Sequence, residues 1–172
     1  MANVIIKRAV AATNVDSYNR SAVAEQNIPN GAVFSLPTKD TSDELLWNVT
    51  APEAYENGLW MATSPEVIYA DKSTGGSADP RDFVNIAGRP IDATLLVAGD
   101  IVEMTGDGIT GIGSTANTYL VADTGFILVA TTAAPTTGGI ALKKVGTGTL
   151  KVGVGTIAPA AIPTYVYEVV AN

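Results

Sequence analysis

The feature that most constrains this sequence is a succession of short apolar runs, each ended within a few residues by glycine, proline or aspartate. The runs are rich in Val, Ile, Thr and Tyr, which suit a pleated, half-buried strand. They are clearest at residues 119–122, 126–130, 139–143, 150–154 and 165–170, with the spacing typical of a sandwich or a small barrel. The sequence therefore predicts a mainly β protein with little helix.

A change of composition at Gly31 predicts how the chain is divided. Before it, the alternation of Val4 and Ile6 gives way to a stretch broken by Asn and Asp, which predicts an extended N-terminal arm. After it, apolar runs and turn residues alternate. The expected organisation is an arm over residues 1–30, a β-rich module over 31–107 with a long loop at 71–90, and a small C-terminal β-barrel over 108–172.

The absence of two residue types limits the chemistry. The chain has no Cys and no His, which removes disulfides, thiolate nucleophiles, Ser-His catalysis and zinc-finger ligand sets. The Gly-rich segment 106–113 lacks the Lys-Ser/Thr of a phosphate-binding loop, and a calcium loop would need several carboxylates beside Asp107. We expect a non-enzyme without metal or cofactor. A carboxylate pair for glycoside hydrolysis stays open as a minor alternative, with the candidates Glu53, Glu56, Glu66 and Asp71.

Charge sets expectations about partners. The net charge is −7 and the pI about 4.4, so the protein repels a phosphate backbone, and we expect no nucleic-acid partner. No window reaches the roughly 18–20 apolar residues of a membrane span, and we expect no membrane partner. Residues 108–172 carry only five charged side chains. Much of that surface either meets other protein or is a neutral Thr/Ser/Gly surface.

The aromatic residues allow two interpretations. Within strands, large aromatic side chains more often fill a core than form an exposed carbohydrate-binding face, and both remain open for Trp47, Tyr55, Trp60 and Tyr69. Tyr165 and Tyr167 fall on one face of the last predicted strand. Core packing is the first expectation for this pair, and an intersubunit contact is the second.

Short motifs occur in a fixed order along the chain. They are Asn3-Val4-Ile5-Ile6-Lys7-Arg8, Glu66-Val67-Ile68-Tyr69, Arg81-Asp82-Phe83-Val84-Asn85, Ala87-Gly88-Arg89-Pro90, Gly99-Asp100-Ile101-Val102 and the closing Tyr165-Val166-Tyr167-Glu168-Val169. This order resembles the head decoration, or cement, proteins of tailed bacteriophages, which attach to the outer surface of an expanded capsid. None of the motifs is catalytic.

The resemblance implies a structural virion protein, made in the host cytoplasm and located on the capsid exterior. Its partners would be the major capsid protein and other copies of itself, as a possible homo-oligomer. The residues that the resemblance and the arm single out as candidate capsid or subunit contacts are Val4, Ile6, Arg8, Arg81, Phe83, Arg89, Tyr165 and Tyr167.

The alternative function is a carbohydrate-binding or adhesin-like β module of a phage tail or a cell surface. Trp47 and Trp60 distinguish the two. Both side chains buried favours the decoration protein, whereas both facing solvent on one plane favours the carbohydrate-binding module.

Overall fold

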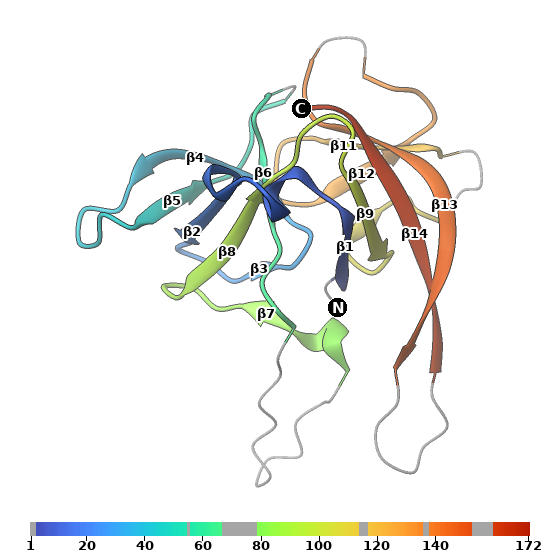
Figure 1. Cartoon of the computed structure of the whole chain (residues 1–172), viewed down its shortest axis with the longest axis horizontal. Helices are drawn as coiled ribbons and strands as arrows, with labels where there is room; N and C mark the ends of the chain where they lie inside the picture. The colour runs from blue at the N-terminus through green and yellow to red at the C-terminus, as the bar shows by residue number, and fades with distance from the viewer. Residues whose placement is uncertain (1–2, 55, 67–78, 114–116, 136–137, 153–159) are drawn as a thin grey trace, which may run out of the picture.

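The computed structural model describes residues 3–54, 56–66, 79–113, 117–135, 138–152 and 160–172. Strands dominate these residues, which confirms the mainly β class (Figure 1). Within the described ranges the helical parts are short 3-10 turns: η1 (Ala11–Thr13), η2 (Asp16–Tyr18) and η3 (Pro80–Asp82).

Five strands form a closed barrel in the order β2-β5-β4-β6-β8. Their bounds are β2 Asn19–Val23, β4 Val33–Lys39, β5 Leu46–Thr50, β6 Trp60–Ala62 and β8 Pro90–Leu95. All neighbouring pairs are antiparallel except β2 and β5, which run parallel. The predicted β-barrel is therefore present, but it lies in the N-terminal part of the chain.

A seven-stranded sheet in the order β1-β9-β14-β13-β11-β12-β10 makes up the rest of the fold, apart from a short pair of β3 (Ile28–Pro29) and β7 (Val84–Asn85). Its strands are β1 Ile5–Ala9, β9 Ile101–Thr105, β10 Ile109–Thr110, β11 Tyr119–Ala122, β12 Leu128–Thr131, β13 Ala141–Val152 and β14 Ala160–Ala171. The pair β13–β14 is much longer than its neighbours and extends beyond them as a two-stranded ribbon (Figure 1).

Strand alternation divides the apolar residues between two cores. Phe34, Ala62 and Ile91 point into the barrel, and the other buried residues of this core are Ile28 and further alanines. Val33 and Met61, their neighbours in sequence, point out of the barrel and pack in the core of the seven-stranded sheet. The barrel and the sheet are therefore joined through one shared apolar interface.

The N-terminal segment is extended, but it is not a free arm. Its first strand, β1, pairs with β9 at the edge of the large sheet, and β2 pairs on both sides within the barrel. Ala22 and Ala24 belong to the barrel core. Low hydrophobic content led to the expectation of an arm, yet these residues supply backbone hydrogen bonds and small core side chains that a propensity argument does not weigh.

The expected module boundaries also change. Residues 108–172 form no barrel of their own, because their strands belong to the large sheet, which is completed by β1 and β9. Of the expected loop at 71–90, residues 71–78 lie outside the described ranges, and residues 79–90 contain η3, β7 and the first residue of β8. Strand pairing between distant segments, which local patterns do not encode, decides both differences.

Candidate functional site

The N-terminal candidates serve the fold of their own chain. Val4 is buried, and its backbone N–H donates to Thr105 Oγ1 at 3.1 Å. Ile6 is half-buried on β1. Arg8 is largely exposed, but its Nε donates to Glu103 Oε2 at 2.6 Å. Val4 is therefore removed from the contact candidates, and Arg8 is already paired.

Glu103 is a carboxylate buried on β9, on the sheet face opposite Val102 and Met104. It also accepts a hydrogen bond from Thr164 Oγ1 of β14. Burial alone would raise the pKa of Glu103, but the hydrogen bonds from Thr164 and Arg8 outweigh burial and lower it. Gly148 of β13 lies directly against this carboxylate. The cluster ties together four strands of the sheet.

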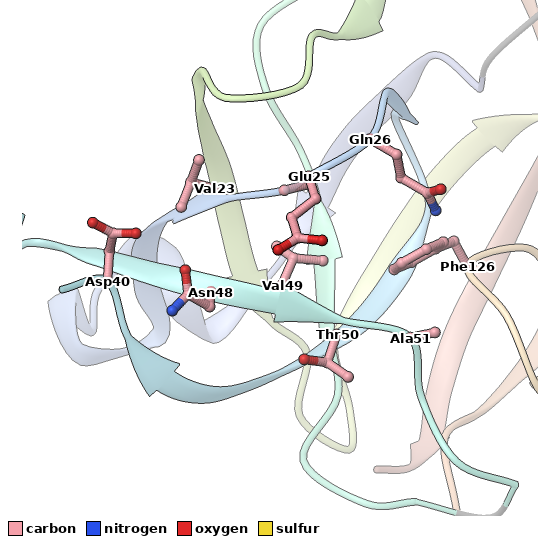
Figure 2. A pocket seen from close by; sticks show the side chains of 10 residues that line it. Val23, Glu25, Gln26, Asp40, Asn48, Val49, Thr50, Ala51 and Phe126 are labelled. Carbon is pink, nitrogen blue, oxygen red and sulfur yellow. The ribbon is translucent and has the colours of Figure 1, made fainter. Parts of the chain in front are cut away.

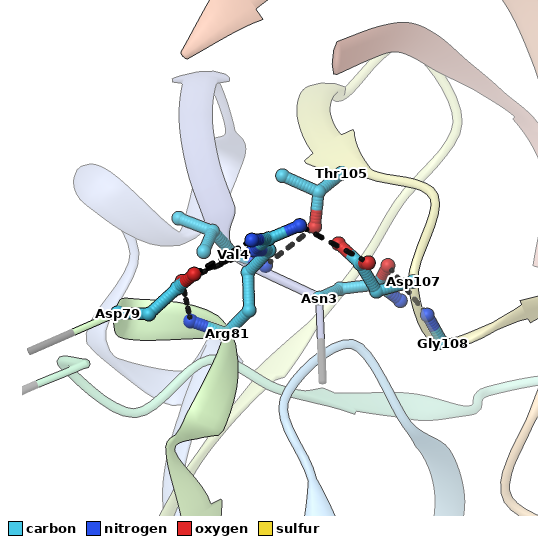
Figure 3. Close-up of polar contacts among 7 residues, drawn as sticks. All are labelled: Asn3, Val4, Asp79, Arg81, Thr105, Asp107 and Gly108. Carbon is cyan, nitrogen blue, oxygen red and sulfur yellow. Dashed lines mark hydrogen bonds and ion pairs between the residues drawn. The ribbon is translucent and has the colours of Figure 1, made fainter. Parts of the chain in front are cut away.

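Arg81 forms the centre of a second polar cluster (Figure 3). Its guanidinium donates to Asp79, with Nη2 2.6 Å from Oδ2, and its Nη1 lies 3.6 Å from Asp107 Oδ1. The hydrogen bond from Arg81 lowers the pKa of Asp79. In the adjoining turn, Asn3 Oδ1 accepts from the N–H of Gly108 at 3.1 Å. The Asp107 carboxylate, considered above for calcium, instead faces a guanidinium.

The segment that contains Phe83 and Arg89 mainly stabilises the fold. Asn85 is buried and donates to Ile28 O and to Asn30 Oδ1 at 3.1 and 3.0 Å. Gly88 has φ +72°, which allows the turn before β8. Phe83 is half-buried, whereas Arg89 is exposed. Among these residues Arg89 is the candidate available to a partner.

The two tyrosines of β14 differ in exposure. Tyr167 is 3% exposed and belongs to the core of the sheet, and burial raises its pKa to about 12. Tyr165 is half-buried, with Lys144 Nζ 4.6 Å from its ring centroid. Core packing, the first expectation, is confirmed for Tyr167, which is not available to a second chain.

Trp47 and Trp60 meet neither of the two expected outcomes, because both are half-buried. With Arg20 and Leu36 they line a hollow of about 200 Å³. Arg20, Trp47 and Trp60 each lie two residues before a residue of the barrel core: Ala22 on β2, Val49 on β5 and Ala62 on β6. Side chains two residues apart on a strand share a face, so the hollow lies at one open end of the barrel. The Arg20 Cζ atom is 5.8 Å from both indole centroids.

A larger hollow of about 740 Å³ lies beside β5 and extends to Phe126 (Figure 2). It contains the carboxylates of Glu25 and Asp40. Asp40 Oδ1 accepts from the hydroxyl and the N–H of Ser42, and these bonds lower its pKa. The Glu25 side chain, in contrast, has no hydrogen bond or ion pair within the described residues.

Of the earlier glycosidase candidates, Glu56 and Glu66 use their carboxylates within the fold, whereas Glu53 contributes only its backbone N–H. Glu66 Oε1 accepts from Ile5 N and Asn30 Nδ2, and Glu56 accepts from Ser35 and from the N–H of Glu53. Asp71 lies outside the described residues. Over the described ranges, no group of three or more acidic side chains is arranged to hold a metal ion. No helix in that part of the chain is long and apolar enough to cross a membrane.

Comparison with known proteins gives no match: no family model, no curated protein and no solved structure is significantly similar to this chain. Two functional candidates of the structure were not found from the sequence. Arg20 was overlooked because it lay in the expected arm, although its alternation with the buried Ala22 is a strand signal. Glu103 interrupts an apolar run, and an acidic residue at such a position indicates a buried carboxylate that needs a partner.

Proposed function

We propose that this protein is a non-catalytic structural protein of a tailed-phage virion that binds the outer surface of the mature capsid. The order of motifs described above supports this proposal. The main structural support for it is the β13–β14 ribbon, whose two strands extend beyond the strands that pair with them. This ribbon is the proposed contact surface for the major capsid protein or for another copy.

The ribbon has strand edges that the described chain leaves without a neighbour. β11 pairs with β13 only over residues 141–143, and β9 pairs with β14 only over residues 164–168. Beyond these points β13 and β14 pair only with each other. A two-stranded ribbon is marginally stable in water, and its free edges invite another chain. A protein surface that pairs with these edges would stabilise the ribbon.

The composition of the ribbon fits contact with protein. Between Val145 and Tyr167 the only charged side chain is Lys151. Val145, on this stretch, is 50% exposed, and Val170, further along β14, is 41% exposed. Soluble proteins protect free edges with charges, and one lysine is little protection. The uncharged surface of the C-terminal part therefore includes the ribbon, whose strand edges are unpaired.

The proposed mechanism is thermodynamic. A protein that binds only the expanded lattice stabilises that state by mass action. Copies bound at repeated sites, and in contact with one another, gain avidity without needing a strong individual contact. The net charge of −7 suits a location outside the shell, away from the packaged nucleic acid.

Cosedimentation with undecorated expanded capsids tests the proposal. The full chain should pellet with capsids and saturate at a fixed number of copies per shell. Thr149→Glu, at an exposed position on β13, should weaken binding at least tenfold, whereas Thr41→Glu, in an exposed barrel turn, should not. Failure of the full chain to bind any expanded capsid of its source phage would refute the function. Equal binding by both variants would refute the ribbon as the contact surface.

A further inference from the structure

One end of the barrel presents a guanidinium close to two indole rings, with Arg20 Cζ 5.8 Å from each ring centroid. From this arrangement we infer that the end of the barrel is a binding site for a saccharide that carries a carboxylate, such as a hexuronic acid residue. The inference gives the carbohydrate-binding alternative a definite site and a definite class of ligand. It is independent of capsid attachment, because the site lies on the barrel and the proposed contact surface lies on the ribbon of the sheet.

Arg20 is positioned to bind an anion. Within the described residues it has no carboxylate partner, and its one hydrogen bond runs from Nη1 to Asn19 O at 3.3 Å. The side chain is half-buried near the start of β2. Contact with the two rings holds the planar group in place, so its remaining N–H groups can meet a carboxylate through two parallel hydrogen bonds.

The acidic side chains of the turn that precedes β5 do not occupy the guanidinium, and Asp92, which lines a second hollow with Arg20, forms no ion pair with it within the described residues. The turn between β4 and β5 contains Asp40 and Asp43, and both accept hydrogen bonds from their own turn: Asp40 from Ser42, and Asp43 from the N–H of Leu45. Lys39, at the end of β4, instead places its Nζ 5.8 Å from the Trp47 ring centroid. Two cations therefore flank Trp47 in a protein whose net charge is −7.

The rest of the lining suits a sugar ring. The indole of Trp47, the indole of Trp60 and the side chain of Leu36 offer apolar surface for the C–H groups of a saccharide, while its hydroxyls stay in water. The volume of about 200 Å³ is small and has room for one ring and not for an extended ligand. A carboxylate distinguishes the ligand from neutral sugars because it can accept two parallel, charge-assisted hydrogen bonds from Arg20, which a hydroxyl group cannot.

Intrinsic fluorescence tests this inference directly. The chain contains only two tryptophans, and both line the site, so their emission reports on it alone. The full-length protein is titrated with a short oligogalacturonate, with a galactose oligomer of equal length and with inorganic phosphate. We expect a saturable change with the oligogalacturonate that weakens as salt is added, and at least tenfold weaker binding of the neutral oligomer and of phosphate.

Matched variants identify the residue that binds. Arg20→Gln should weaken binding at least tenfold, and Arg20→Lys, which keeps the charge but loses the planar group, should also weaken it. Arg89→Gln removes one charge from an exposed position outside the site and should bind as the native chain does. Thermal melts confirm that each variant is folded. Lys39→Gln, which removes the other cation near Trp47, serves if Arg20→Gln does not fold.

Some results would overturn the inference. One is the absence of a saturable response to the oligogalacturonate, and another is equal affinity for the neutral oligomer. A response to phosphate as strong as that to the oligogalacturonate would mean a general anion site and would reject the saccharide. Capsid cosedimentation of Arg20→Gln should be unchanged, so a loss there would show that the barrel end belongs to the capsid contact instead.

Discussion

The close contact between Gly148 and the buried Glu103 gives a sharp test of how the sheet is packed. A Cβ atom added at Gly148 would collide with Glu103 Oε1 and would lie 2.7 Å from Thr164 Oγ1. Both oxygens belong to the hydrogen bond that helps to hold the buried carboxylate. Gly148→Ala must therefore move Glu103 or Thr164, and with them the pairing to Arg8.

The expected cost follows from the groups that move. Overpacking of this kind costs about 1–3 kcal/mol, and weakening a hydrogen bond to a charged group costs a similar amount. Replacing glycine by alanine inside a strand returns about 0.5–1 kcal/mol. Together these figures predict that Gly148→Ala lowers the free energy of unfolding by about 1–5 kcal/mol, and each kcal/mol lowers the melting temperature of a chain of this size by about 2–4 °C.

Gly146, two residues earlier on β13, supplies the control. A Cβ atom there would meet only Val166, at 3.6 Å, which is an ordinary contact. Gly146→Ala should therefore leave the melting temperature unchanged or raise it slightly. Urea unfolding and thermal melts followed by circular dichroism measure both variants. If Gly148→Ala is as stable as Gly146→Ala, the argument that Gly148 is required to accommodate Glu103 is wrong.

Three further predictions concern the same architecture. Arg8→Gln should lower the free energy of unfolding by about 1 kcal/mol at pH 7. Because Arg8 helps to lower the pKa of Glu103, the difference between the variant and the native chain should shrink as the pH falls below about 4. Urea titrations that give a difference independent of pH would contradict this prediction. Deleting residues 2–28 removes β1 and β2 and opens the barrel, so calorimetry should show no cooperative melt. A native-like melt would instead support the interpretation of this segment as a free arm. Tyr167, with a pKa of about 12, is stabilising while neutral, so stability should fall between about pH 10 and 12; no alkaline loss in a tyrosine absorbance and melting series would contradict its burial.

The sequence alone determined the class of fold, and particular residues show why. Runs such as residues 119–122 and 165–170 alternate or cluster β-branched and aromatic residues between turn formers, and the structure has strands at both. The lack of Cys and His limited the chemistry without any reference to structure. These are local or compositional properties, and each can be assessed without knowing which segments meet.

The tertiary structure decided which strands pair and what each side chain contacts. β1 joins β9 across about half of the chain, and β2 closes the barrel between β5 and β8. These pairings depend on hydrogen bonds between distant backbones, and segments with weak side-chain patterns can still supply them. The expected arm was lost for this reason, and the expected barrel moved from residues 108–172 to residues 19–95.

The candidate sites depend on the same long-range pairing. The guanidinium of Arg20 lies near both Trp47 and Trp60 only because barrel closure brings the starts of β2, β5 and β6 together. Glu103 can remain charged inside the protein only because β1 and β14 bring Arg8 and Thr164 to it. Sequence reveals the residue types available for such contacts. Their arrangement is set by strand register, which fixes the face and the neighbours of every side chain together.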